Sequence, residues 1–254
     1  MRAYLPPTND EERLFAKQIA QLVKASQYDG KARATMFLSD RQQDIAAAIF
    51  SRDNFQQFIF TGGYDQAQRR ILVLCEEQAK AAARFVCAEV LTKQSSSSLT
   101  HRDYLGAFLA IGVKREAIGD IIVKESGAIF FAVPAVARLI CDELTSVGRI
   151  AVKAQLMAAP PMVEQVEQAP LITANIPSLR LDAMLAAMLK CSRSDAQSLV
   201  RAGQVQVNHI TVNSVHYDIC ADDIFTVRGY GKYKLCEIGG KSRKDRIFVQ
   251  FQQF

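Results

Sequence analysis

The chain has 254 residues, of which 49% are hydrophobic and 22% are charged, and its formal net charge is +5. This length suits two or three small domains, and the composition is that of a globular protein. No apolar run approaches the ~20 residues that span a bilayer, and the N-terminal segment lacks the apolar core of an export signal. These features exclude a membrane-spanning protein, and we expect a cytoplasmic one.

The six cysteines are scattered along the sequence, and no two of them form a Cys-x-x-Cys pair. Scattered cysteines are typical of small buried side chains in a reducing compartment. We therefore expect neither a metal nor a cofactor, although a zinc site assembled from distant residues stays open as an alternative.

The positive charge is concentrated near the C-terminus. Residues 178–254 hold 11 Lys and Arg against 7 Asp and Glu, whereas the first 177 residues hold 20 against 19. Between Arg228 and Arg246, seven basic residues face only Glu237 and Asp245. A basic stripe confined to one domain indicates a partner that carries phosphates, whereas the same cluster standing alone would favour a solvated surface.

Four of the seven prolines fall within residues 160–177, which show little helical pattern. Such a stretch is typical of an interdomain linker. We predict an α+β protein with a small N-terminal domain at 1–78, a middle domain at 79–155, a linker at 156–178 and a C-terminal domain at 179–254.

The N-terminal domain is predicted to combine two helices with a hairpin and shows no catalytic spacing. Its predicted elements are a helix over 9–27, a helix from Ser39 or Asp40 to Ile49 or Phe50, and strands 58–61 and 71–75 joined across Gly62-Gly63.

The middle domain alternates strands and helices. Thr100 can begin a helix, with Asp103 in the position of a capping box, and Pro134 suits the start of another helix. The resulting order, β-α-β-β-α-β, is a split βαβ layer like that of the RNA-recognition motif. The predicted strands are 85–91, 118–124, 128–133 and 150–152.

The RNA-recognition motif stacks bases on aromatic side chains of its third strand. Here that strand offers Phe130 and Phe131, which are adjacent and therefore point to opposite faces. The strand also lacks the motif's basic-Gly-aromatic signature. A role in packing or protein contact is therefore the stronger interpretation of this sheet, and base recognition is the weaker one.

The C-terminal domain is predicted to begin with two helices. The first carries apolar residues at helical spacing from Leu181 to Leu189, and the second begins at Ser192, with Asp195 completing a capping box. Arg193 then lies in the first turn, where the helix dipole favours a negative charge. We interpret this as a sign of an external anion, because backbone N–H groups and a guanidinium can share one phosphate. Gly203 suits the left-handed end of the helix.

A short hairpin follows the second helix. Val205 and Val207 alternate with polar residues, and Asn208-His209 is predicted to turn the chain into a strand at 210–212. A later strand at 224–227 completes the small sheet.

This pattern resembles the RNA-binding domain named after ribosomal protein S-four of the small subunit. Cys191 and His209 depart from it, because glycine is usual at both positions, and both changes affect loop geometry more than charge. The matching residues are Arg180-Leu181-Asp182, Ser192-Arg193-Ser194, Ala196-Gln197, Arg201, Gly203, Val205, Val207-Asn208 and Asp223.

Further segments resemble the YlmH family of bacterial RNA-binding proteins. They are 99–106, 114–120, 229–234 and 239–246. Because they occur in both the middle and the C-terminal domains, we expect the resemblance to cover the full length. It implies a cytosolic factor that associates with the large ribosomal subunit and with tRNA, in a family linked to rescue of stalled nascent chains.

We predict RNA contacts from both C-terminal segments. Arg193 is the strongest candidate, while Arg201 is balanced between a phosphate contact and a surface ion pair. Tyr230 and Tyr233 are candidate stacking partners. The predicted RNA-binding residues are Arg180, Ser192, Arg193, Ser194, Gln197, Arg201, Asn208, Lys232, Lys234, Lys241, Arg243, Lys244 and Arg246.

Asp182 is the best catalytic candidate by motif, since Arg-Leu-Asp also surrounds the catalytic aspartate of pseudouridine synthases. Here the motif lies inside the first helix of the RNA-binding domain, so we assign Asp182 a structural or capping role. His101, His209 and His216 show neither metal-ligand spacing nor a paired nucleophile.

The leading hypothesis is a monomeric, non-enzymatic factor that binds ribosomal RNA and tRNA and has no small-molecule substrate or membrane partner. One alternative is an RNA-modifying enzyme similar to pseudouridine synthases, with the first 155 residues as its catalytic domain. Another is a protein-interaction scaffold in cell division or ribosome assembly, which would bind a protein partner through the middle domain.

Overall fold

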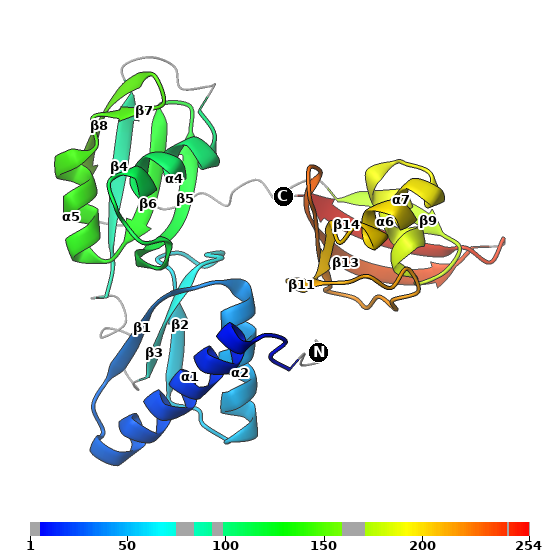
Figure 1. Cartoon of the computed structure of the whole chain (residues 1–254), viewed down its shortest axis with the longest axis horizontal. Helices are drawn as coiled ribbons and strands as arrows, with labels where there is room; N and C mark the ends of the chain where they lie inside the picture. Colours follow the sequence, from blue (N-terminus) through cyan, green and yellow to red (C-terminus); the bar gives the residue numbers. More distant parts are fainter. Residues whose placement is uncertain (1–5, 75–83, 93–98, 159–170, 243, 254) are drawn as a thin grey trace. The chain divides into compact units, whose positions relative to one another are not determined.

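The computed structural model describes residues 6–74, 84–92, 99–158, 171–242 and 244–253. These residues form two compact units, one up to residue 158 and one from residue 171. Figure 1 shows the first unit in blue to green and the second in yellow to red. The predicted N-terminal and middle domains both lie in the first unit.

The N-terminal domain packs two helices on a three-stranded antiparallel sheet. Helix α1 (Asp10–Asp29) and helix α2 (Asp40–Arg52) confirm the two predicted helices. Strands β2 (Phe58–Thr61) and β3 (Arg70–Leu74) confirm the predicted hairpin, although Cys75 lies outside the described residues. Strand β1 (Arg33–Leu38), which was not predicted, completes the order β1-β3-β2.

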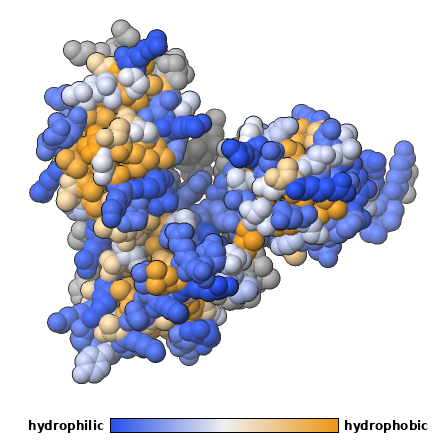
Figure 2. Space-filling model, viewed as in Figure 1, coloured by the Kyte–Doolittle hydropathy of each residue, from blue (hydrophilic) through white to orange (hydrophobic). Residues whose placement is uncertain are grey.

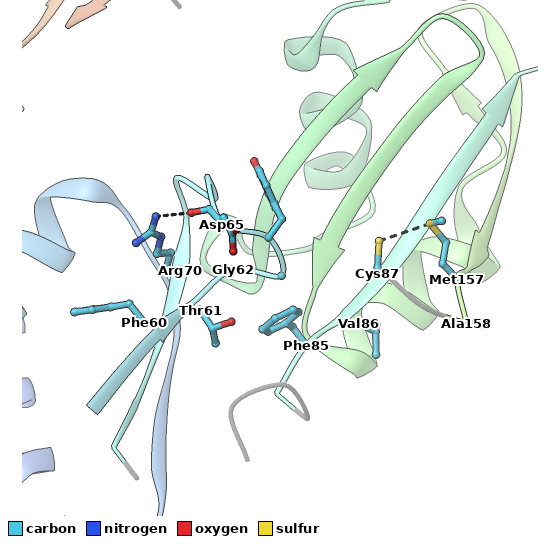
Figure 3. Close-up of a pocket in the computed structure, with 12 residues that line it drawn as sticks. Phe60, Thr61, Gly62, Asp65, Arg70, Phe85, Val86, Cys87, Met157 and Ala158 are labelled. Carbon is cyan, nitrogen blue, oxygen red and sulfur yellow. Dashed lines mark hydrogen bonds between the residues drawn. The ribbon is translucent and has the colours of Figure 1, made fainter. Parts of the chain in front are cut away.

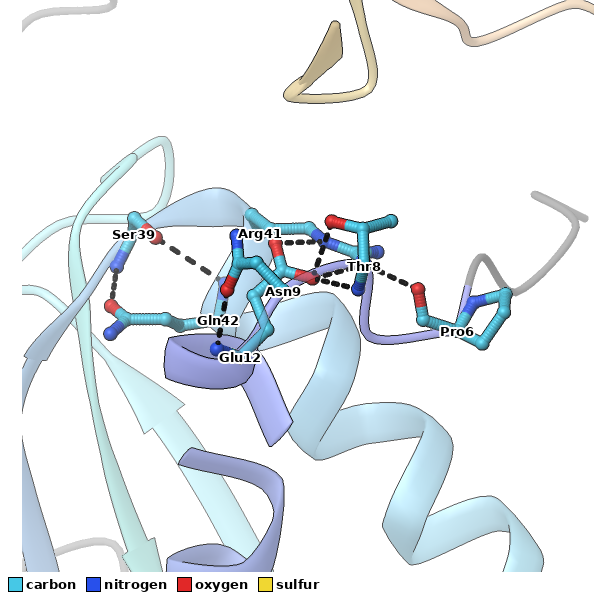
Figure 4. A network of polar contacts seen from close by, with 7 residues as sticks. All are labelled: Pro6, Thr8, Asn9, Glu12, Ser39, Arg41 and Gln42. Atoms are coloured by element: carbon cyan, nitrogen blue, oxygen red, sulfur yellow. Dashed lines mark hydrogen bonds and ion pairs between the residues drawn. The ribbon is translucent and has the colours of Figure 1, made fainter. Parts of the chain in front are cut away.

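An ion pair joins the starts of the two helices (Figure 4). Arg41 is buried and donates from Nε and Nη2 to the Glu12 carboxylate at 3.1 and 2.9 Å. Its Nη2 also donates to the carbonyl oxygen of Pro6 at 2.9 Å. The hydrogen bonds from Arg41 lower the pKa of Glu12. This contact fixes the two N-termini against each other.

The middle domain has the predicted β-α-β-β-α-β order. Its sheet is antiparallel in the order β5-β6-β4-β8-β7, with a short extra strand, β7, at the edge. The elements are β4 (Val86–Thr92), α4 (His101–Ala110), β5 (Ile118–Lys124), β6 (Gly127–Ala132), α5 (Pro134–Glu143), β7 (Ser146–Val147) and β8 (Ile150–Leu156).

Strand β6 is buried on both faces. Phe130 points to the helices, where its ring centroid lies 4.8 Å from that of Phe108. Phe131 points the other way, into a core shared with Phe37, Ile71 and other side chains of the N-terminal sheet. Both phenylalanines are fully buried. The prediction that they occupy opposite faces is confirmed, and both contribute to packing.

The two sheets of the first unit therefore face each other across a second core. Along β3, Leu72 points to helices α1 and α2, whereas Ile71 and Val73 point to the middle sheet. Gly119 permits the close approach, because a Cβ there would lie 2.6 Å from the Phe37 ring. The part of this face around Ile129 and Phe131, which corresponds to the RNA-binding face of RNA-recognition motifs, is thus covered by protein.

Asp120 on β5 holds the connection between β2 and β3 against the middle domain. Its carboxylate accepts hydrogen bonds from the Tyr64 hydroxyl at 2.8 Å and from the backbone N–H groups of Gln68 and Arg69 at 2.7 and 3.0 Å. Arg69 donates in turn to the carbonyl oxygen of Ile118 at 3.0 Å. Burial and the Asp120 charge raise the pKa of Tyr64. The junction thus combines an apolar core with an oriented polar contact.

The C-terminal unit is a six-stranded antiparallel sheet with two helices on one face. The sheet order is β11-β10-β12-β13-β14-β9. Side chains of both helices and the inner sheet face form one core, which includes Leu185, Val200 and Phe251. The elements are β9 (Ile172–Ile176), α6 (Leu181–Leu189), α7 (Arg193–Arg201), β10 (Val205–Val207), β11 (Ile210–Thr211), β12 (Ile224–Val227), β13 (Gly231–Lys241) and β14 (Ile247–Gln253).

Two sequence predictions are corrected here. The predicted linker at 156–178 is too long, because Leu156 ends β8 and Ile172–Ile176 form strand β9, paired with β14. The basic segment from Arg228 to Arg246 is not a tail, since most of it forms the β13–β14 hairpin. The first error arises because β9 pairs with β14, which lies far along the sequence. The second has another cause, since β13 and β14 are neighbours along the chain. Among the described residues, no helix is long and apolar enough to cross a membrane.

Candidate nucleic-acid interface

The corner between α6 and α7 is set by local residues. Helix α6 ends at Leu189, the following Lys190 takes a left-handed φ of 51°, and α7 begins after Ser192. The Ser192 hydroxyl accepts a hydrogen bond from the Asp195 backbone N–H at 3.1 Å and donates to the Asp195 carboxylate at 2.7 Å. This confirms the predicted capping box. It leaves Arg193 and Ser194 exposed at the start of the helix.

Asp182 is buried in the first turn of α6 and accepts hydrogen bonds from three side chains. Arg193 donates from Nε and Nη2 at 2.9 and 3.2 Å, and Gln197 donates from Nε2 at 2.9 Å. Arg180 donates from Nε and Nη2, each at 3.2 Å. Burial would raise the pKa of Asp182, but these hydrogen bonds outweigh it and hold the pKa well below its ordinary value. Asp182 is therefore ionised at neutral pH.

We call Asp182, Arg180, Arg193 and Gln197 the Asp182 cluster. Two guanidinium groups surround one carboxylate, so the cluster carries a net charge of +1. The Asp182 side chain is 0% exposed, whereas those of Arg180 and Arg193 are 32% and 46% exposed. The negative charge is thus covered, and the positive charges reach the surface in a fixed geometry.

The cluster corrects one step of the sequence argument. From the sequence, the position of Arg193 in the first turn of α7 is interpreted as a sign of an external anion. The structure supplies an internal one, because the Asp182 carboxylate lies 2.9 Å from Arg193 Nε. The unfavourable position of Arg193 on the helix dipole is therefore offset inside the domain. RNA contact by Arg193 stays a prediction.

Asn208 has a structural role in the hairpin turn. It adopts φ 49° and His209 adopts φ 68°, as expected for this tight turn. Its Nδ2 donates to the buried Asp223 carboxylate at 2.7 Å, and its Oδ1 accepts from the Ile224 backbone N–H at 3.0 Å. Both ends of the amide thus contact the protein, and RNA contact by Asn208 stays a prediction.

The described basic residues predicted from Lys232 onwards lie on two parts of the β13–β14 hairpin. Lys232 and Lys234 alternate with buried side chains along β13, and Lys234 pairs with Asp222 at 3.2 Å. Lys241 pairs with Asp245 at 2.9 Å near the turn. Arg201, Lys241, Lys244 and Arg246 are exposed, whereas Arg243 lies outside the described residues.

The two candidate stacking tyrosines have different surroundings. Tyr233 is 4% exposed and its ring packs in the core against Phe251, so the prediction of stacking by Tyr233 is wrong. Tyr230 lies in the β12–β13 turn and is 47% exposed. Side chains alternate between the two faces of a strand. A strand predicted from Gly231 would therefore have placed Tyr233 on the buried face and Tyr230 in the preceding turn.

A pocket of about 580 Å³ lies in the first unit between the β2–β3 connection and strand β4 (Figure 3). Aromatic and sulfur-containing side chains line it, including Phe60, Phe85 and Met157. None of the predicted site residues lines this pocket. Among the described residues, no group of three or more His, Cys, Asp or Glu side chains is placed to hold a metal ion.

The helix–helix corner, the hairpin and the Asp182 cluster together define an RNA-binding domain of the S4 type. The S4 domain family matches residues 179–225, so the β13–β14 hairpin lies outside that match. A second family, described as "Putative RNA-binding domain in YlmH", matches residues 85–159.

Similarity extends over nearly the whole chain. The chain is 30% identical over 246 residues to "Ribosome-associated protein quality control protein P2" of Bacillus subtilis. The match covers 96% of this chain and 95% of that protein. The chain therefore belongs to the YlmH family. The structure "Cell division protein ylmH from Streptococcus pneumoniae" covers 65% of this chain and 100% of its own, with a TM-score of 0.52 and 18% identity. That likeness concerns the fold.

Proposed function

We propose that the protein is a non-enzymatic RNA-binding factor that associates with the large ribosomal subunit and tRNA in the cytoplasm, where it handles stalled nascent chains. The Asp182 cluster is the observation that carries the RNA-binding part of this proposal. The name of the Bacillus subtilis relative supports association with ribosomes and a role in quality control.

The chemistry of the cluster suits a phosphate. Each guanidinium presents a planar set of five N–H donors, and it is the Nε and Nη2 groups that donate to Asp182. The hydroxyl groups of Ser192 and Ser194 lie beside Arg193 in sequence at the exposed helix start. Arginine and helix N-termini are both recurrent phosphate-binding elements.

The β13–β14 hairpin provides the second basic element. Lys241 is 62% exposed, and its partner Asp245 is 81% exposed, so solvent weakens their mutual attraction. Such a lysine can exchange its carboxylate partner for a phosphate at little cost. We therefore include Lys241, Lys244 and Arg246 in the proposed RNA-binding surface.

The test is co-sedimentation of a double variant, Arg193→Ala with Lys241→Ala, with purified large ribosomal subunits. We expect binding to fall by at least tenfold, because one contact is removed from each basic element. The matched control is Arg13→Ala with Lys17→Ala, which removes two basic side chains from α1 in the other unit. Thermal unfolding of both variants checks that they are folded. Equal binding by the double variant and the wild type would refute the site.

The structure bears on the RNA-modifying alternative through Asp182. A catalytic aspartate must reach its substrate, but this carboxylate is fully buried and accepts five hydrogen bonds from protein donors. The remaining test of this alternative is incubation of the protein with bulk RNA, followed by nucleoside analysis. A new modified nucleoside would overturn the non-enzymatic proposal.

An exposed apolar surface favours the scaffold alternative as a second function. Figure 2 shows hydrophobic side chains gathered on the visible face of the middle domain, over α4 and α5. Leu109 on α4 and Leu139 on α5 are 42% and 41% exposed. A scaffold role predicts that Leu109→Ser with Leu139→Ser removes protein–protein crosslinks that persist after RNase treatment, while co-sedimentation with ribosomes is unchanged.

A further inference from the structure

Tyr230 is an aromatic side chain presented to solvent by an ordered turn. It lies between β12 and β13, and 47% of it is exposed. Gly229 and Gly231 flank it with φ values of +86° and +110°, which only glycine adopts readily. Exposure of a large ring at such a turn loses the burial that normally stabilises a tyrosine.

Hydrogen bonds hold the backbone of this turn while the ring stays exposed. The Tyr230 N–H donates to the Val227 carbonyl oxygen at 3.0 Å, which closes the turn. The Tyr230 carbonyl oxygen accepts from the Tyr233 hydroxyl at 3.3 Å and from Gln253 Nε2 at 3.2 Å. Three contacts thus fix the position from which the ring projects.

The turn lies at the same end of the sheet as the C-terminus of α7. Val227 pairs with Val205 on one side and with Gly231 on the other. Val205 is the first residue of β10, which follows α7 closely in sequence. The Arg228 N–H donates to the carbonyl oxygen of Gln204 at 3.0 Å, which joins the turn to that segment.

The charge of these segments is entirely positive. Residues 196–217 and 224–236 contain no Asp or Glu. Their basic residues are Arg201, Arg228, Lys232 and Lys234, of which Lys234 pairs with Asp222 outside these ranges. An aromatic side chain among basic residues is the combination that binds single-stranded nucleic acid, since bases stack on the ring and cations neutralise the phosphates.

We propose that Tyr230 stacks on an unpaired base of the RNA bound by the C-terminal unit. This inference rests on the proposed function and specifies which kind of nucleotide the surface takes. The exposed side chains of Arg201 and Arg228 supply the positive charge that neutralises neighbouring phosphates in this arrangement. A base inside a duplex is covered by its neighbours on both faces, so the tyrosine selects a loop, a bulge or a single strand.

The sequence offers a direct optical test, because the chain contains no tryptophan. Tyr230→Trp therefore introduces a single tryptophan whose fluorescence is quenched when a base stacks on it. The probe is a short oligouridine added to the full-length protein. We expect strong quenching by the single strand and little by an RNA duplex of the same length. The matched control is Tyr28→Trp at a 94% exposed tyrosine of the other unit, where we expect no quenching.

Affinity measurements separate stacking from charge and from hydrogen bonding. Tyr230→Ala should weaken oligouridine binding roughly 5- to 100-fold without changing its salt dependence, because no charge is lost. Tyr230→Phe should bind like the wild type. A loss in Tyr230→Phe equal to that in Tyr230→Ala would assign the contact to the hydroxyl and overturn stacking.

The outcomes distinguish this inference from the proposed function. If the wild type binds RNA and large subunits but Tyr230→Ala binds both equally well, the stacking inference is wrong and the proposed function stands. If the wild type binds large subunits but not oligouridine, a weaker affinity of Tyr230→Ala for the subunits supports stacking. If the wild type binds neither, both proposals fail.

Discussion

At the scale of single residues, the Asp182 cluster shows how one carboxylate can organise a cationic surface. Asp182 is buried, and it accepts hydrogen bonds from two guanidinium groups and one amide. Charge-assisted hydrogen bonds of this kind are stronger than neutral ones, and a fork of two bonds also fixes direction. The carboxylate therefore positions Arg180 and Arg193 instead of merely neutralising them.

Replacing that carboxylate should destabilise the C-terminal unit. We expect Asp182→Asn to lower its free energy of unfolding by about 1–3 kcal/mol, since hydrogen bonds to a charged group weaken and two arginines lose their counterion. Partial exposure of both arginines keeps the loss below that of a fully buried pair. Urea unfolding measures it, with Asp245→Asn as the control because that carboxylate is 81% exposed. An unchanged midpoint in Asp182→Asn would contradict the positioning role.

The same variant should also change the response to acid. The pKa of Asp182 is lowered in the folded protein, so the stabilisation that it gives is complete above the ordinary carboxyl pKa of about 3.9. It is lost as the pH falls below that value towards the folded pKa. The difference in stability between wild type and Asp182→Asn should therefore shrink below about pH 4 and stay constant from pH 5 to 7.

At the scale of elements, the junction between the two sheets of the first unit depends on Asp120. Its carboxylate receives the backbone N–H groups of Gln68 and Arg69, so it orders the connection between β2 and β3. An apolar core fixes the distance between two facing sheets, but it does not by itself prevent one sheet from sliding over the other. The hydrogen bonds to Asp120 add direction to that contact.

Asp120→Ala should loosen this connection locally. We expect hydrogen exchange at the amides of Gln68 and Arg69 to accelerate at least tenfold, while the amides of α2 keep their protection, because the core beneath them is unchanged. Asp103→Ala, which removes the acceptor at the start of α4, serves as a matched control and should affect only that helix. Unchanged exchange at Gln68 would show that packing alone orders the segment.

Elements whose causes are local could be predicted from the sequence. The starts of α2, α4 and α7 follow from capping residues three positions apart, as at Ser192 and Asp195. Strands β1 and β9 were missed, because only their partners β3 and β14 make them strands. The bond between Arg193 and Asp182 was missed for a related reason, since it joins two helices across a corner. The covering of Phe131 likewise depends on another domain.

At the scale of the whole molecule, the charge distribution sets how binding responds to salt. The described basic residues of the proposed surface lie in the C-terminal unit, in the Asp182 cluster and on the β13–β14 hairpin. Each phosphate that a basic side chain neutralises releases condensed counterions from the RNA. The number of such contacts can therefore be measured without a structure of the complex.

Affinity for large ribosomal subunits should fall linearly on a logarithmic plot against salt concentration. We expect Lys241→Ala with Lys244→Ala to reduce the steepness of that line by about 1.4–1.8, which corresponds to two lost phosphate contacts. Tyr230→Ala should shift the line without changing its slope. A slope unaffected by the lysine substitutions would place the hairpin outside the RNA contact.

The burial of Asp182 also has a consequence for the entropy of recognition. A free arginine side chain carries roughly 2 kcal/mol of rotamer entropy, which is lost when it is fixed on a phosphate. In this protein, Arg180 and Arg193 are already held by Asp182 before any RNA arrives. The rotamer entropy of these two arginines is therefore lost when the domain folds and not when it binds RNA. An RNA backbone whose phosphates match the fixed arginines can then bind more tightly than the modest net charge of the cluster would indicate. A flexible polyanion of equal charge gains less affinity, because its own conformational entropy is still lost on binding.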